Sequence, residues 1–385
     1  MTKKWSSRLT FFAFVVLMVG LGSNDSLRGI FSTIFQEHFS LTTTQLGLIV
    51  TASYIGNLVF LLVGGNLSTR FSKKRVLQVL ILIWMAALAL FAFTSNYTVL
   101  LIGMALALGS STLLNTTMNL ITPLLFATAP GFFVNFLFFT QEIGTSGSQY
   151  ILGSHADGFA FWQHTNLVLL ILGAVAFVLL LFCNVPEEAA APADAPAQKG
   201  GYDWRIIVPY VLVFGFYFIA EHGVMNWMVA YGVDGLGLPQ ASAAKYLSVF
   251  FGGMMIGRLC LSPLVDKLGA LKSLAAFGGV SCVLYLIGAV TMPVWAISGL
   301  SFSILYPTLV MSIRLYFPAQ QVSGAAGTIL SIASLADILF NVGFGKLVDM
   351  TGYAVSIRVL PLSALAFFIV FMLFTKFCKP TQKLK

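Results

Sequence analysis

The feature that most constrains this chain is a series of apolar runs, each about twenty residues long, separated by short polar breaks. A helix rises about 1.5 Å per residue, so about 20 apolar residues cross the roughly 30 Å hydrocarbon core of a bilayer. Only 9% of the 385 residues are charged, whereas soluble domains carry about 25%. This composition argues against a soluble enzyme, and the sequence predicts an all-α polytopic membrane protein.

Hydropathy and loop breaks predict twelve membrane-spanning helices. They cover residues 9–35, 43–65, 76–94, 98–122, 132–153, 166–183, 206–231, 241–263, 273–292, 294–316, 322–346 and 354–377. Between the sixth and seventh spans, an Ala/Pro-rich polar stretch has the composition of a flexible linker. We therefore expect a six-helix bundle over 1–183, a cytoplasmic linker over 184–205 and a second six-helix bundle over 206–385.

The basic residues are distributed unevenly along the chain. With a cytoplasmic N-terminus, 16 of the 21 Lys and Arg residues fall on the cytoplasmic side. Because positive residues are enriched on that side, both termini are predicted to be cytoplasmic, in a multi-pass protein of the cytoplasmic (inner) membrane. The net charge of +8 is then a topology signal, and no nucleic-acid partner is expected. Trp162 and Trp295 are expected at the outer interface.

The two halves of the chain resemble each other in the loops after the second and eighth spans. Leu67 aligns with Leu264, and Arg70 aligns with Lys267, at a shift of 197 residues. This shift is about half the chain. Tandem duplication of a six-helix unit is the simplest explanation.

Twelve spans, a central linker and a repeated basic loop resemble the major facilitator superfamily of secondary transporters. The first copy of the loop departs from the family pattern, because Thr69 stands at its acidic position and Ser72 at its second glycine. The second copy keeps Asp266 and Gly269. This departure bears on the charge-relay lock that the loop forms in relatives, to which Arg70 and Asp266 would belong, and not on the fold.

Within the superfamily, five short motifs resemble the fucose:proton symporter branch. They are Asn24-Asp25, Asn115-Thr116-Thr117-Met118-Asn119, Glu221 ahead of Trp227 and Tyr231, Gly252 to Arg258, and Tyr306-Pro307-Thr308. The resemblance implies proton-coupled sugar transport in which the acid at the position of Asp25 takes part. Where relatives have a proton-carrying glutamate, this chain has Asn115, which cannot titrate. Either Glu142 on the neighbouring span takes that role, or coupling differs from that of the relatives.

Four of the 13 acidic residues lie well inside the predicted spans, at Asp25, Glu142, Glu221 and Asp337. A charged side chain at the bilayer centre costs at least ~2.5–3.5 kcal/mol, so such groups tend to mark substrate or proton pathways. Asp25 and Arg28 share one helix face and can pair. The pair either pins the first span, or its protonation decides whether Arg28 has a partner. We predict Asp25, Glu142 and Glu221 as proton-coupling groups.

Polar residues at helical spacing accompany these acids. Glu142, Thr145 and Gln149 form a stripe along one face, and Asn115 and Asn119 are stacked one turn apart. Such groups either form hydrogen bonds between helices, each of which contributes ~0.6 kcal/mol to stability, or bind a solute. The predicted substrate-binding residues are Asn24, Asn115, Asn119, Gln141, Thr145, Gln149, Tyr217, Asn226, Tyr306, Asp337 and Asn341.

The remaining charged residues have simpler expected roles. Asp337 is expected to supply charge selectivity or to pair with a buried Arg. Arg258 and Arg314 lie near the cytoplasmic ends of their spans, where snorkelling or gating ion pairs account for them. His222 is adjacent to Glu221 and could titrate, although a single histidine is more often a hydrogen-bonded structural group. The predicted gating or ion-pair residues are Arg28, Arg70, Arg258, Asp266 and Arg314.

Motifs for other chemistry are absent from the sequence. It contains no P-loop, no His/Cys cluster with metal-ligand spacing and no catalytic Gly-x-Ser-x-Gly elbow. We expect no enzyme activity, no cofactor and no metal, and a monomer in the bilayer. The leading hypothesis is alternating access, in which two bundles rock about a central site and take up a small polar solute, a sugar, with protons. The alternative is proton-antiport efflux of drugs or metabolites.

Overall fold

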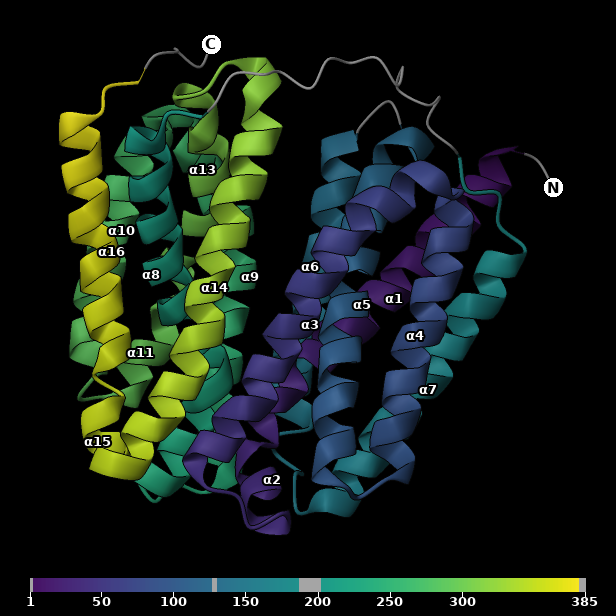
Figure 1. The fold of residues 1–385 in the computed structure, drawn as a ribbon, viewed down its shortest axis with the longest axis horizontal. Helices are drawn as coiled ribbons and strands as arrows, with labels where there is room; N and C mark the ends of the chain where they lie inside the picture. The colour runs from purple at the N-terminus through teal and green to yellow at the C-terminus, as the bar shows by residue number, and fades with distance from the viewer. Residues whose placement is uncertain (1–2, 127–129, 187–201, 381–385) are drawn as a thin grey trace. The chain divides into compact units, whose positions relative to one another are not determined.

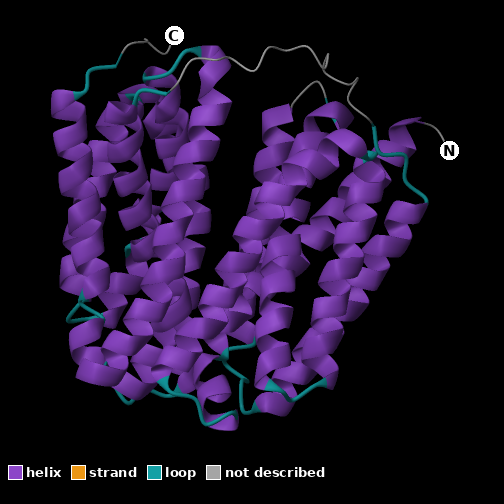
Figure 2. Cartoon of the chain, in the orientation of Figure 1, coloured by secondary structure: helices purple, strands orange, loops and turns teal. Residues whose placement is uncertain are grey.

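The computed structural model describes residues 3–126, 130–186 and 202–380, and all regular elements in these ranges are helices (Figure 2). Some helical side chains are outside the description: 3–6, 63–70, 123, 130–132, 135, 266, 319–320 and 323. The predicted gating residues Arg70 and Asp266 are among them. The chain divides into two compact units, Met1–Ala195 and Pro196–Lys385 (Figure 1). Most of the predicted linker lies outside the described residues, so its bounds remain a prediction.

The first unit contains seven described helices. They are α1 (Lys3–Ile30), α2 (Ser32–His38), α3 (Thr43–Arg70), α4 (Lys73–Phe93), α5 (Tyr97–Leu125), α6 (Pro130–Ile151) and α7 (Phe159–Leu181). The first predicted span is broken at Phe31, between α1 and α2. Helix α7 begins at Phe159 and not at residue 166. Gln163 and His164 lower the local hydropathy, but they do not interrupt the helix.

The second unit is divided into more pieces. They are α8 (Trp204–Ala230), a π-helical turn η1 (Tyr231–Gly235), α9 (Gln240–Leu268), α10 (Ala270–Gly288), α11 (Met292–Ile297), α12 (Gly299–Phe302), α13 (Leu305–Ser312), a 3-10 turn η2 (Ile313–Leu315), α14 (Ala319–Thr351), α15 (Tyr353–Ser356) and α16 (Val359–Phe377). The predicted tenth span is the broken stretch α11 to η2. In it, Ser298, Ser301 and Ser303 each donate a hydrogen bond to the carbonyl three residues earlier. Serine hydroxyls that bond in this way often bend helices.

The number of spans agrees with the sequence. Eleven segments of the described chain are long and apolar enough to cross a bilayer. Helix α6 is the remaining one, and it is less apolar because Gln141, Glu142 and Gln149 lie on it. With α6, the structure has the twelve-helix arrangement that the hydropathy pattern predicts.

The two units pack their helices in the same pattern. In the first, α1 packs against α6 and α7, α3 against α5, and α4 against α7. In the second, α8 packs against α14 and α16, α9 against α11 and α12, and α10 against α16. These are the same pairs of spans, counted from the start of each unit. The shift of 197 residues also places Gly56 on Gly253, and each glycine lies close to the backbone of a neighbouring helix. The packing therefore supports a tandem duplication.

Two tryptophans predicted at the membrane interface lie in the core. Trp162 and Trp295 are 0% and 1% exposed. The Trp162 ring lies 4.8 Å from the Phe35 ring and 5.3 Å from the Phe31 ring, centroid to centroid. The two rings therefore face neighbouring helices and do not form an exposed aromatic belt, whereas their depth in the membrane stays a prediction.

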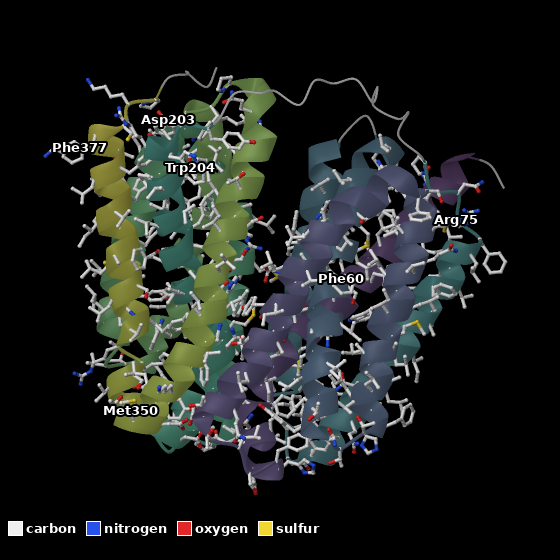
Figure 3. The ribbon with its side chains drawn as sticks, viewed as in Figure 1. Phe60, Arg75, Asp203, Trp204, Met350 and Phe377 are labelled. Atoms are coloured by element: carbon white, nitrogen blue, oxygen red, sulfur yellow. The ribbon has the colours of Figure 1, made fainter. Side chains whose placement is uncertain are left out.

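Basic side chains gather at particular helix ends. Lys74 Nζ donates to the carbonyls of Leu181 at 3.0 Å and Cys183 at 2.7 Å, so it ties the start of α4 to the end of α7. Figure 3 labels the next residue, Arg75, at this end of the first unit. In the second unit, Asp203, Trp204 and Phe377 lie at one end and Met350 at the other (Figure 3). The start of α8 and the end of α16 thus share one end, as the predicted topology requires.

Candidate functional site

The predicted residues of the first unit gather where α1 crosses α6. Gly22 and Gly144 make the crossing possible. A Cβ at Gly22 would lie 2.0 Å from the Gln141 carbonyl oxygen, and one at Gly144 would lie 2.1 Å from the Val19 carbonyl oxygen. Thr145 Oγ1 donates to the Gly22 carbonyl at 3.2 Å. The two backbones are in direct contact, and this contact fixes the polar faces of both helices.

Asp25 lies beside this crossing and is half-buried. Ser111 Oγ on α5 donates to Asp25 Oδ2 at 3.2 Å, and Asp25 Oδ1 has no hydrogen-bond partner among the described residues. The charge of Arg28 acts on this carboxyl, and the Arg28 guanidinium also lies 5.7 Å from the centroid of the Tyr54 ring. The effect of Arg28 on this carboxyl is consistent with the predicted pairing of Asp25 with Arg28, which stays a prediction. Ser111 was missed, and its signal is the polar run Gly109-Ser110-Ser111-Thr112 in the fourth span.

An amide chain joins α5 to α6. Asn115 Nδ2 donates to Gln141 Oε1 at 2.7 Å, and Asn119 Nδ2 donates to Asn115 Oδ1 at 2.6 Å. All three side chains are half-buried, and Asn119 Oδ1 is left without a partner in the described part of the chain. The stacking of Asn115 on Asn119 was predicted, whereas the bond to α6 was not. The structure thus brings three predicted substrate residues together.

The predicted stripe on α6 divides into three environments. Glu142 is half-buried, whereas Thr145 is buried and bonded to the backbone of α1. Gln149 is 0% exposed, and neither of its amide atoms has a hydrogen-bond partner among the described residues. Most buried polar groups in folded proteins are hydrogen-bonded. Gln149 is therefore the least satisfied residue of the stripe, and Glu142 is the more accessible one.

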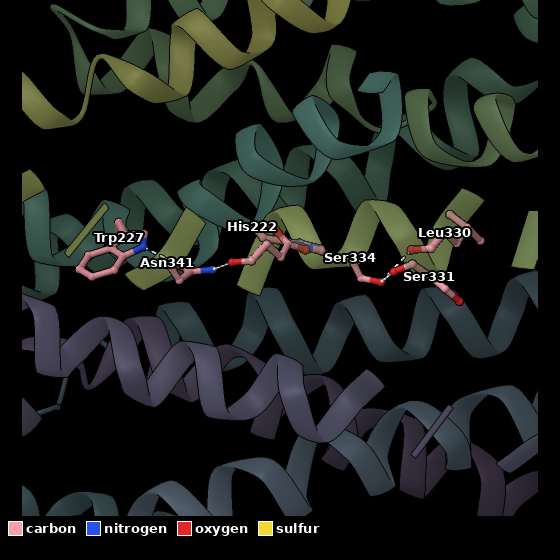
Figure 4. Close-up of polar contacts among 7 residues, drawn as sticks. His222, Trp227, Leu330, Ser331, Ser334 and Asn341 are labelled. Carbon is pink, nitrogen blue, oxygen red and sulfur yellow. Dashed lines mark hydrogen bonds and ion pairs between the residues drawn. The ribbon is translucent and has the colours of Figure 1, made fainter. Parts of the chain in front are cut away.

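Two predicted substrate-binding residues, Asn24 and Asn341, each accept a hydrogen bond from a tryptophan of their own unit. Trp84 Nε1 donates to Asn24 Oδ1 at 3.2 Å, and Trp227 Nε1 donates to Asn341 Oδ1 at 2.9 Å. Asn341 also donates from Nδ2 to the Asp337 carbonyl at 2.8 Å (Figure 4). Both asparagines are buried, at 6% and 0% exposure. This geometry favours helix-to-helix bonding over solute contact at these two positions.

Glu221 of the second unit is buried in an aromatic environment. Its charge acts on the hydroxyls of Tyr217, Tyr285 and Tyr306, which lie on α8, α10 and α13. Arg258 on α9 acts on Tyr217 and Tyr306, so it lies near this interior cluster. The role expected for Arg258, snorkelling or a gating ion pair, stays a prediction. Tyr217 is 0% exposed and Tyr306 is half-buried, which leaves Tyr306 as the more accessible ring.

His222 and Asp337 join α8 to α14. His222 Nδ1 lies 2.7 Å from Asp337 Oδ2, and Asp337 Oδ1 has no hydrogen-bond partner among the described residues. Figure 4 shows His222 in a line with Trp227 and Asn341 on one side and Ser334 on the other. The expected partner of Asp337 was a buried Arg or a solute. The structure gives it a histidine.

The remaining predicted residues are placed as follows. Asn226 on α8 is 1% exposed, and Arg314 in η2 is exposed at a helix end, as expected. The half-buried predicted residues are Asp25, Asn115, Asn119, Gln141, Glu142, Arg258 and Tyr306. Within the described ranges, no group of three or more His, Cys, Asp or Glu side chains could hold a metal ion.

These features are typical of a membrane transporter. Polar and ionisable side chains inside apolar spans are costly and mark transport pathways, and repeated six-helix units are a common transporter architecture. The model of the Major Facilitator Superfamily matches residues 10–336. The chain belongs to this superfamily, as the sequence resemblance predicted.

Several characterised relatives are transporters and not enzymes. A glucose/galactose transporter of Brucella abortus is 27% identical over 343 residues, covering 82% of this chain and 81% of the relative. The L-fucose-proton symporter of Escherichia coli is 23% identical over 333 residues, covering 74% and 75%. A cis,cis-muconate transport protein of Acinetobacter baylyi is 24% identical over 297 residues, covering 71% and 70%. The similarity to the fucose symporter agrees with the branch indicated by the motifs.

Solved structures agree with the fold. The nucleoside transporter NupG superposes with a TM-score of 0.76 at 12% identity, covering 98% of this chain and 100% of that chain. The transporter FucP in its outward conformation superposes with a TM-score of 0.64 at 20% identity, covering 96% and 99%. At these identities, the likeness concerns the fold alone.

Proposed function

We propose that this chain is a secondary active transporter that takes up a small polar solute, a sugar, together with protons by alternating access. The names of two relatives, a glucose/galactose transporter and an L-fucose-proton symporter, support a sugar substrate and proton coupling. The protein resides in the cytoplasmic membrane as a monomer with both termini in the cytoplasm. Its bundles, residues 1–183 and 206–385, are joined by the linker 184–205.

The observation that carries this proposal is the half-buried amide chain formed by Gln141, Asn115 and Asn119. Each amide offers two donors and an acceptor with two lone pairs, so the chain can donate to and accept from the hydroxyls of a sugar. Asn119 Oδ1 is not used by any described residue. Gln149 is fully buried, so it is less suited to direct contact than these three residues.

Proton coupling is assigned to Asp25, Glu142 and Glu221. Protonation of Asp25 would remove the negative charge that attracts Arg28, so the attraction between the two side chains would be lost. Glu142 lies on α6 next to Gln141 in sequence, and its side chain is half-buried. A proton that binds one conformation better than the other shifts the balance between them.

The test uses the purified full chain in liposomes. Counterflow of labelled D-glucose, D-galactose and L-fucose is compared with that of cis,cis-muconate, which represents the organic-acid relative. We expect exchange of at least one sugar, and accumulation when the lumen is made alkaline, abolished by a protonophore. Exchange of muconate without any sugar contradicts the substrate class. Accumulation driven only by an acidic lumen supports antiport efflux instead.

A further inference from the structure

Glu221 and His222 are adjacent in the sequence of α8, but their side chains lie on different faces of the helix. Successive residues of an α-helix point about 100° apart, because there are about 3.6 residues per turn. The charge of Glu221 acts on tyrosines of α8, α10 and α13, whereas His222 contacts Asp337 on α14. The second unit therefore holds two separate ionisable sites at one level of α8.

We propose that His222 and Asp337 form a proton-binding site of their own, in which one shared proton holds α8 against α14. This site is distinct from the predicted coupling groups Asp25, Glu142 and Glu221. Its effect on transport rests on the proposed function, whereas proton binding by the pair does not.

The net charge of the His222–Asp337 pair depends on one proton. The Asp337 side chain is 2% exposed, and its Oδ1 has no hydrogen-bond partner in the described part of the chain. A lone carboxylate buried in this way is strongly disfavoured, whereas an imidazolium beside it makes the pair neutral. On proton uptake, the imidazole of His222 gains an N–H bond and the pair loses its net negative charge. On release, the proton passes to water and the negative charge returns.

The imidazole of His222 stacks on an aromatic ring and is partly exposed. The ring of Phe218 lies parallel to that of His222, with 5.2 Å between centroids and 6° between planes. An aromatic face attracts a cation at this distance. The His222 side chain is 24% exposed, whereas that of Asp337 is 2% exposed. The proton therefore enters and leaves through the histidine.

Other charged groups lie on the elements that pack against α8 and α14. They are Arg205 and Glu221 on α8, Lys245, Arg258, Asp266 and Lys267 on α9, Asp234 in η1, Arg314 in η2, Lys346 and Asp349 on α14, and Lys376 on α16. The titratable hydroxyls nearby are those of Tyr217, Tyr285 and Tyr306. Glu221 is the acid next to His222 in the chain, so the experiment must separate its influence from that of Asp337.

The pair has a mechanical consequence because α8 and α14 are joined at a second point one turn away. Trp227 Nε1 donates to Asn341 Oδ1, and Asn341 follows Asp337 by one turn of α14. The Trp227–Asn341 bond contains no group that titrates at physiological pH, so it persists when the proton leaves. Proton release therefore weakens one of two ties between the helices and leaves the other as a pivot.

The direct test is the charge state of the His222 ring in the full chain, labelled with ¹⁵N-histidine and held in lipid nanodiscs. The protein has four histidines, and His222→Gln assigns the relevant signal. At mildly alkaline pH, we expect two N–H groups on the ring of His222, and only one on the ring of His164, which is exposed on α7. In Asp337→Asn, we expect His222 to lose one of its two N–H signals. In Glu221→Gln, both should remain.

One N–H on the wild-type His222 ring, or two in Asp337→Asn, overturns the inference. The wild-type comparison of His222 with His164 needs no variant, so it stands even if Asp337→Asn does not fold. A transport measurement then separates this inference from the proposed function. We expect His222→Gln and Asp337→Asn to flatten the pH dependence of sugar exchange, and His164→Gln to leave it unchanged. If the wild type shows the expected ring signals but transports no sugar, the proposed function is wrong and the proton-binding site of His222 and Asp337 stands.

Discussion

The same pairs of spans are in contact in the two units, but one of those pairs is held together by different interactions in each unit. Helices α1 and α6 meet backbone to backbone at Gly22 and Gly144. The corresponding helices α8 and α14 leave more room, because a Cβ at Gly215 would lie 3.4 Å from that of Ala336. Side-chain bonds join them instead. One scaffold thus carries a fixed helix pair in its first unit and a pair with a titratable tie in its second.

The largest effect is expected at the fixed crossing. In Gly22→Ala and Gly144→Ala, the added methyl meets a backbone carbonyl at 2.0 Å and 2.1 Å, so a helix must move. We expect each to lower the free energy of unfolding by about 3 kcal/mol, at the upper end for overpacking. The measurement is unfolding of the purified protein in detergent.

Two glycines serve as controls for this prediction. Nothing lies within 4 Å of a Cβ at Gly147, and the contact at Gly215 is an ordinary one. Alanine at either should be neutral or stabilising by up to ~1 kcal/mol, because it favours the helix over glycine. If Gly22→Ala and Gly147→Ala unfold alike, the described crossing of α1 and α6 is wrong.

A medium effect is expected at the two asparagines that hold tryptophans. Asn24→Leu and Asn341→Leu each leave a buried indole N–H without its acceptor, which costs about 1–3 kcal/mol. Asn341→Leu should cost more, because it also removes the bond to the Asp337 carbonyl. Unfolding in detergent measures both. A larger loss for Asn24→Leu would show that the first unit, and not the second, depends more on side-chain ties.

The smallest effect is expected at the end of α7. Lys74→Ala removes a cation that caps the last carbonyls, at Leu181 and Cys183, and should cost about 0.5 kcal/mol. The neighbouring Arg75 is exposed, so Arg75→Ala is the matched control and should change nothing measurable. Equal stability of the two variants in low salt would contradict the capping role.

The sequence predicts features that depend on local pattern. Hydropathy gives the twelve spans, and helical spacing gives the stack of Asn115 on Asn119. Contacts between helices were missed, because they depend on which faces meet. The bonds from Ser111 to Asp25 and from His222 to Asp337 are of this kind. The packing of the Trp162 ring against Phe35 inside the bundle was missed for the same reason.

In the proposed mechanism, the amide chain of α5 and α6 binds the solute while Glu142 couples its movement to protons. The most direct test measures sugar counterflow and accumulation driven by a pH gradient in the same liposomes. We expect Asn115→Leu to weaken both, with an apparent affinity about 10-fold lower, as for the loss of about 1.4 kcal/mol. Glu142→Gln should abolish accumulation and keep part of the counterflow, and the exposed Thr116→Val should match the wild type. Wild-type counterflow by Asn115→Leu, or wild-type accumulation by Glu142→Gln, would contradict this mechanism.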